Sequence, residues 1–170
     1  MFTIHTGVFE SSFVPDVDVA EIAAEADEDI ASIRKRNDRA YATEVLSRGL
    51  KSLLPKLFAQ GLFDGVLSFG GTGGTSLVAP GMRQLPIGIP KLIVSTVASG
   101  DTSVYVGTSD IMMMPSIVDV SGLNKISKRI FGNAVSAMAG LLNYRFETEE
   151  DEHPLVAACL LYTSPSPRDS

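Results

Sequence analysis

A chain of 170 residues, 45% of them hydrophobic and 20% charged, is long enough for one compact domain and too apolar to be a disordered segment. A total of 14 Lys and Arg residues against 20 Asp and Glu gives a net charge of -6, which disfavours partners such as nucleic acid or an anionic membrane surface. The single cysteine and two histidines disfavour disulfide frameworks and zinc sites, and the lack of a long apolar run or secretory signal predicts a cytoplasmic protein.

The chain opens on a short apolar segment that predicts a strand. Phe2, Ile4 and Val8 precede Pro15 and an acidic stretch. Because the chain thus begins as if on a second strand, we expect that sequence has been lost at the N-terminus.

Two helices are predicted next. Asp18, with Glu21 three residues on, predicts an N-cap with a reciprocal acidic partner and a helix over residues 19–26. Asp38 predicts the cap of a longer helix that ends at Gly61. Pro55 within it predicts a kink or break near Leu54. The helix keeps three-to-four spacing of its apolar residues, which are Tyr41, Val45, Leu46, Leu50, Leu53, Leu54, Leu57 and Phe58.

Strands and helices then alternate. Buried strands are predicted over residues 66–69, 91–97, 104–106 and 111–114, with a short helix over 76–82. A long helix over 121–142, with Ser121 as its cap, closes the series. Continuously apolar strands that alternate with helices predict an α/β fold, a Rossmann-like and mostly parallel sheet with helices on both faces.

The C-terminal stretch changes composition abruptly. Residues 154–158 read as the opening of another buried strand, at which the domain is cut short. Residues 159–170 resemble a translated sequencing adapter, so we interpret them as an appended, non-native tail in which Cys159 carries no chemistry; a native polar tail is the alternative. The partial domain therefore covers residues 1–158.

Three polar loops with glycines follow predicted strands and are the candidate binding site. In parallel sheets, ligands bind beyond the carboxyl ends of the strands, so we expect the three loops to line one rim. Glycines let the backbone approach a phosphate, and hydroxyl groups can donate to it. The first loop comprises Gly70, Gly71, Thr72, Gly73, Gly74 and Thr75; the second contains Thr96, Ser99, Gly100 and Asp101; the third comprises Gly107, Thr108, Ser109 and Asp110.

Alternatives stay open at each loop. The first loop lacks the lysine of the GxxxxGK[ST] motif and does not fit GxGxxG, so a tight turn that serves only helix packing remains possible. Asp101 and Asp110 are candidate magnesium ligands or simple caps. The cluster from Arg34 to Arg36, with Arg39, is interpreted as a surface patch. No Ser-His-Asp arrangement is recognisable, and no catalytic residue is assigned.

The stretch GGTGGTSLVAPGMRQLPIGIPKLIVSTVASGD, followed by YVGTSDIMMMPSIVDVSGLNKIS, closely resembles the ATP-binding domain of the tomato mosaic virus resistance protein family. The resemblance implies a two-part Rossmann-like domain of which this chain is the incomplete first half. It implies that the glycine loop faces the phosphates of ATP and that the second and third loops complete the nucleotide rim.

The leading hypothesis is therefore ATP binding through the glycine loop, with magnesium on Asp101 or Asp110 as a possible companion. One alternative is a dimeric protein-interaction module that uses ATP as a structural ligand. Another is an enzyme that acts on a phosphorylated or acyl metabolite. We expect a homodimer in the full-length protein and no nucleic-acid or membrane partner.

Overall fold

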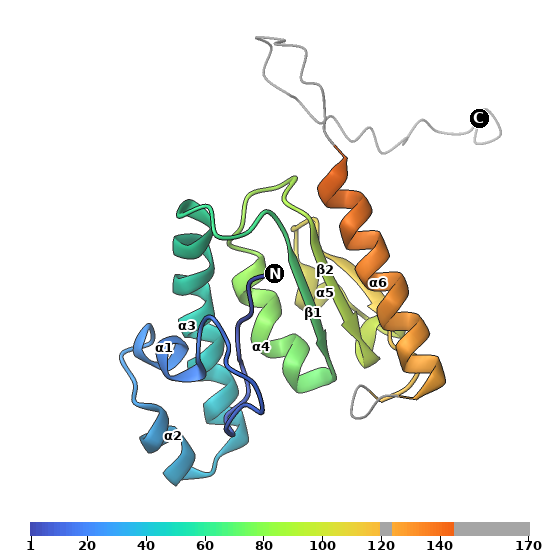
Figure 1. Cartoon of the computed structure of the whole chain (residues 1–170). Coiled ribbons are helices and arrows are strands. Elements are labelled where there is room, and N and C mark those ends of the chain that lie inside the picture. The colour runs from blue at the N-terminus through green and yellow to red at the C-terminus, as the bar shows by residue number, and fades with distance from the viewer. Residues whose placement is uncertain (120–123, 145–170) are drawn as a thin grey trace, which may run out of the picture.

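A three-stranded parallel sheet forms the centre of the protein (Figure 1). The computed structural model describes residues 1–119 and 124–144. The strands are β1 (Val66–Gly70), β2 (Lys91–Ser95) and β3 (Met112–Pro115), in the spatial order β1-β2-β3. Val66 lies opposite Lys91, and Leu92 lies opposite Met112. Every residue of β2 is buried, as its continuous apolar run predicts for the middle strand of a covered parallel sheet.

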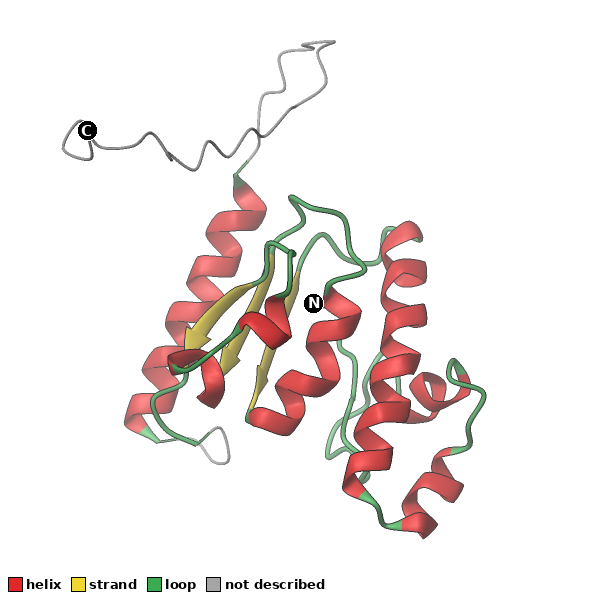
Figure 2. Ribbon diagram, turned by 180° about the vertical axis from the view of Figure 1, so that it is seen from behind, coloured by secondary structure: helices red, strands yellow, loops and turns green. Residues whose placement is uncertain are grey.

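Helices cover both faces of this sheet, which confirms the predicted α/β class (Figures 1 and 2). On one face lie α3 (Arg39–Ala59) and α4 (Thr72–Met82), with α1 (Val19–Ala24) and α2 (Ile30–Arg36) packed against α3. On the other face lies α6 (Lys125–Asn143). Because strand side chains alternate, Ile93 joins the core beneath α3 and α4, whereas Leu92 and Val94 pack with Ala134 and Met138 of α6.

The predicted helix caps are present in the structure. Asp18 forms a capping box with Glu21 at the start of α1, although α1 ends at Ala24, two residues earlier than expected. The Asp38 carboxylate accepts hydrogen bonds from the Ala40 and Tyr41 amides, at 3.0 and 3.1 Å. The helix α3 continues through Pro55 without a break. Its last turns are held by buried side chains on both sides of the proline, including Leu54 and Leu57.

The segment between β2 and β3 differs from the prediction. Residues 104–106, expected to be a strand, belong to the short helix α5 (Ser103–Val106), which follows a 3₁₀ turn, η1 (Thr96–Ser99). Side chains start both turns, because Ser95 accepts a hydrogen bond from the Val97 amide and Asp101 accepts one from the Ser103 amide. The strand β2 consequently ends at Ser95, and the chain turns back before it enters β3.

The starting residues of two helices also differ from the prediction. The helix α4 begins at Thr72 and not at residue 76, so most of the predicted glycine loop forms its first turn. The helix α6 begins after Asn124, whose side chain caps it; the expected cap Ser121 lies outside the described residues, as do the predicted strand at 154–158 and the tail at 159–170. Within residues 1–119 and 124–144, no helix combines the length and apolarity that a membrane crossing requires.

Candidate functional site

The N-terminus of α4 is open at the end of the sheet where the parallel strands finish, called here the carboxyl edge. Gly71 is the N-cap residue, and no side chain caps the helix. The first hydrogen bond of the helix runs from the Thr75 amide to the Gly71 carbonyl, at 2.9 Å. The amides of Thr72, Gly73 and Gly74 precede this bond, so they have no acceptor within the helix. Such a set of free amides, at the positive end of the helix dipole, favours an anion.

The glycines of this loop meet different surroundings. A Cβ atom at Gly70 would lie 3.3 Å from the Gly74 Cα atom, so a tight turn from strand to helix explains Gly70. A Cβ atom at Gly74 would meet nothing within 4 Å among the described residues, and one at Gly73 would meet only the side chain of Arg39. Packing of the turn therefore does not require Gly73 and Gly74 to be glycine, and both residues line an open cavity.

This cavity has a volume of about 580 Å³ and lies between α3, α4 and the N-terminal segment of the chain. Residues 6–9 form one wall, the first turns of α3 and α4 form the others, and Ile33, Leu46 and Leu77 supply apolar surface. Its size is within the range of small-molecule sites. The cavity thus joins free backbone amides to an apolar lining.

Arg39 gives the cavity a positive charge. A Cβ atom built at Gly73 would lie 3.0 Å from Arg39 Nη2, so the guanidinium stands directly before the first turn of α4. Arg39 has no ion-pair partner within the described part of the chain, whereas Arg36 lies 3.9 Å from Asp38 and Arg34 donates to the Val8 carbonyl. The sequence prediction placed Arg39 in a surface patch and missed this position, because only the packing of α3 on α4 brings it there.

Buried hydroxyl groups connect the first loop to the last residue of β2. The Thr75 and Ser95 hydroxyls lie 2.6 Å apart, and Thr75 also donates to the Gly71 carbonyl. Both side chains are completely buried, so Thr75 positions the loop and does not face the cavity. Thr96 lies close by, since a Cβ atom at Gly71 would be 3.6 Å from its Oγ1 atom. The first and second loops therefore meet at the carboxyl edge, as expected.

The rest of the second loop closes on itself. Thr96 to Ser99 form η1, and the Gly100 amide donates to the Val97 carbonyl. The Asp101 carboxylate accepts a hydrogen bond of 2.9 Å from the Ser103 amide, which is the capping role left open by the sequence. Two hydrogen bonds from Ser103 hold the pKa of Asp101 below its usual value. The bond from the Ser103 side chain has the larger effect, and the bond from its backbone amide has the next largest.

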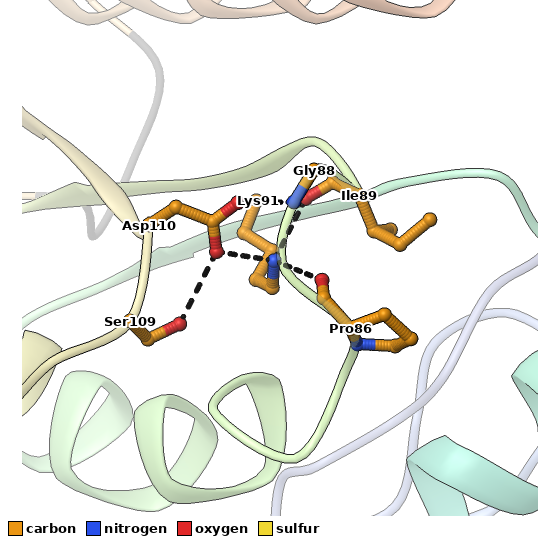
Figure 3. A network of polar contacts seen from close by, with 6 residues as sticks. All are labelled: Pro86, Gly88, Ile89, Lys91, Ser109 and Asp110. Carbon is orange, nitrogen blue, oxygen red and sulfur yellow. Dashed lines mark hydrogen bonds and ion pairs between the residues drawn. The ribbon is translucent and has the colours of Figure 1, made fainter. Parts of the chain in front are cut away.

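The third loop lies at the opposite end of the strands, where the parallel strands begin (the amino edge). Gly107, Thr108, Ser109 and Asp110 precede β3, so they lie where the parallel strands begin. Asp110 accepts hydrogen bonds from the Lys91 Nζ atom at 2.6 Å and from the Gly88 amide at 2.7 Å, and Ser109 is in reach at 3.4 Å (Figure 3). The expectation that three loops line one rim is therefore wrong for this loop, because residues 104–106 do not form a strand.

Lys91 and Asp110 form a structural ion pair at this amino edge. The Lys91 side chain is fully buried, and its ammonium group also donates to the Pro86 and Ile89 carbonyls (Figure 3). Burial raises the pKa of Asp110, but the hydrogen bonds from Lys91 and Gly88 outweigh this effect, so the pKa lies below its ordinary value of 3.8. Among the residues described, no three His, Cys, Asp or Glu side chains gather in a cluster suited to a metal ion.

The family model and the similar proteins agree on one protein family. Residues 1–147 match the N-terminal domain of the Uncharacterised protein family (UPF0261). A UPF0261 protein of Clostridium tetani is 40% identical over 153 residues, which cover 90% of this chain and 38% of the relative. The ToMV resistance protein Tm-1(GCR237) of Solanum lycopersicum is 40% identical over 139 residues, which cover 82% of this chain and 18% of the relative. The chain thus spans well under half the length of these relatives.

Proposed function

The chain belongs to the uncharacterised protein family UPF0261, and we propose that it binds ATP, with the phosphates against the first turn of α4. The observation that carries this proposal is the meeting of free helix amides at Thr72, Gly73 and Gly74 with the guanidinium of Arg39, which has no ion-pair partner in residues 1–119 and 124–144. Amides at a helix N-terminus and an arginine are the groups that proteins use for phosphate. The resemblance of the glycine loop to that of an ATP-binding domain supports the same assignment.

The remainder of the cavity suits the rest of a nucleotide. Apolar side chains from α2, α3 and α4 line it beyond the phosphate position, and its volume of about 580 Å³ exceeds what a phosphate alone needs. Neither of the two carboxylates predicted as magnesium ligands lines this cavity: Asp101 accepts a hydrogen bond from the Ser103 amide, and Asp110 is held by Lys91 where the strands begin. We therefore assign no ligand to an accompanying magnesium ion. No catalytic residue is assigned.

The proposal is tested by thermal unfolding of the protein with ATP, ADP and sugar phosphates, with and without magnesium. A ligand at 100 times its Kd should stabilise the folded state by about 2.7 kcal/mol, which raises the melting temperature. Phosphate release measured in parallel distinguishes a binding protein from an ATPase. A preference for sugar phosphates over ATP would favour the alternative of an enzyme that acts on a phosphorylated metabolite.

Two variants locate the site. Gly73→Val places a side chain against Arg39 and before the free amides, so it should abolish stabilisation by ATP while the circular dichroism spectrum is retained. Gly132→Ala, on α6 where a Cβ atom meets nothing within 4 Å among the described residues, is the matched control and should respond to ATP like the parent. If Gly73→Val responds as the control does, the phosphates do not bind at α4.

A further inference from the structure

Phe9 is an exposed aromatic residue at the cavity before α4. Its neighbours Ile4 and Val8 pack against the hydrophobic core, whereas Phe9 joins no part of the core and pairs with no other aromatic ring among the described residues. Phe9 is 85% exposed, and yet it lines the cavity together with Gly73 and Gly74. A single exposed apolar side chain is ordinary on a protein surface. The informative observation is therefore the position of this ring and not its exposure.

Two side chains fix the backbone that carries Phe9. The Nε atom of Arg34, on α2, donates to the Val8 carbonyl at 2.7 Å, and the His5 Nε2 atom lies 2.8 Å from the Phe9 carbonyl oxygen. The turn between them is tight, because a Cβ atom at Gly7 would lie 2.9 Å from the His5 Cε1 atom. The ring is thus carried by an anchored turn, so less conformational entropy is lost when a ligand contacts it.

The cavity combines this ring with the proposed phosphate position. Its volume of about 580 Å³ is within the range of sites that enclose a whole small molecule, so a ligand with its phosphates against α4 also has its remaining part inside the cavity. That part meets Ile33, Leu77 and Phe9, which supply apolar and aromatic surface. Such a lining favours a flat, weakly polar group over the hydroxyl groups of a sugar.

We propose that Phe9 determines the ligand class of this site by stacking on the base of a nucleotide. The inference rests on the proposed function, and it adds a contact that the amides of α4 and the Arg39 guanidinium do not supply, because those groups recognise phosphate alone. Aromatic side chains stack on bases because every base has a π face. The site should therefore prefer ATP to inorganic tripolyphosphate, which has a chain of three phosphates but no base.

Isothermal titration calorimetry of the protein with ATP and with tripolyphosphate measures this preference. Phe9→Ala should weaken the binding of ATP about 10-fold, near the lower end of what a base stacked on an aromatic ring contributes, and should leave the affinity for tripolyphosphate unchanged. Phe9→Tyr keeps the ring and should bind ATP like the parent. If the parent binds the two ligands equally tightly, or if Phe9→Ala weakens both by the same factor, Phe9 does not stack on a base.

Fluorescence gives a second readout that a merely structural role would not change. The sequence contains no tryptophan, so Phe9→Trp introduces a single reporter. ATP should quench its emission and tripolyphosphate should not, because only ATP carries a base. Phe13→Trp is the matched control, since Phe13 is an aromatic residue of the same segment, 54% exposed, that lines a second cavity. Equal responses of the two variants to ATP would overturn the stacking contact.

The inference about Phe9 and the proposed function fail in different ways. We expect Gly73→Val to lose both ligands and Phe9→Ala to lose affinity for ATP alone. If Gly73→Val loses both ligands and Phe9→Ala binds both like the parent, the phosphates lie at α4 but the base lies elsewhere, and only the inference about Phe9 is overturned. If the parent binds neither ATP nor tripolyphosphate, the proposed function fails, and the role of Phe9 fails with it.

Discussion

We predict that removing Asp110 from its ion pair with Lys91 destabilises the protein more than removing Lys91 does. Lys91 is fully buried, and its Nζ atom has three acceptors: the Pro86 carbonyl, the Ile89 carbonyl and Asp110. The substitution Asp110→Ala removes the only charged one and leaves a buried ammonium group. Removing one partner of a buried pair typically costs about 3–5 kcal/mol. Because the Asp110 side chain is 35% exposed and water can replace part of it, we expect about 2–3 kcal/mol.

The opposite substitution should cost much less. Lys91→Met removes the buried charge, keeps an apolar side chain of similar length and leaves Asp110 partly in water with its hydrogen bond from the Gly88 amide. We expect a loss below about 1 kcal/mol. The double variant should be more stable than Asp110→Ala alone, since it carries no unpaired buried ammonium.

Urea unfolding followed by circular dichroism measures these differences. For a domain of this size, a loss of 2–3 kcal/mol corresponds to a decrease in melting temperature of roughly 6–10 °C. Equal losses in the two single variants, or a double variant as unstable as Asp110→Ala, would refute the reasoning that the uncompensated ammonium group determines the cost.

The same pair predicts a dependence on pH. The pKa of Asp110 is lower in the folded state than its ordinary value of 3.8, so its contribution to stability is complete above that value. It is lost as the pH falls through the lower, folded-state pKa. Asp110→Asn removes this contribution, so the difference in unfolding free energy between parent and variant should be constant near neutrality and shrink below about pH 4. A difference that does not shrink in acid would show that the Asp110 charge contributes nothing.

Two further predictions concern packing and the glycine loop. Gly49→Ala would place a Cβ atom 1.9 Å from the Ile22 carbonyl oxygen, so it should destabilise the contact between α1 and α3 by at least about 3 kcal/mol. The control Gly132→Ala on α6 should be neutral or stabilising. Equal melting temperatures of the two variants would contradict the close approach of α1 and α3. Thr75→Val removes the hydroxyl contact with Ser95 and should lower the free energy of unfolding in urea by about 1–2 kcal/mol. Thr75→Ser keeps the hydroxyl and should lower this free energy by less. The reverse order would exclude a stabilising role for the hydroxyl.

Local signals in the sequence predicted local structure well. The caps at Asp18 and Asp38 are present, because a carboxylate that accepts from the amides of a first turn needs only its neighbours in the chain. The strands β1 and β2 were predicted because each is a short apolar run followed by residues that leave the strand conformation. The predicted class of the fold followed from the order of these elements and is confirmed.

Contacts between distant residues were not predictable in the same way. Nothing near Arg39 in the sequence indicates Gly73, and nothing near Lys91 indicates Asp110, because packing of helices and strands creates both contacts. The error at residues 104–106 had a local cause. Val104, Tyr105 and Val106 favour a strand by propensity. The Ser95 hydroxyl and the Asp101 carboxylate, however, accept hydrogen bonds from the Val97 and Ser103 amides, and the resulting turns place the segment in a short helix. That error moved Asp110 to the wrong edge of the sheet.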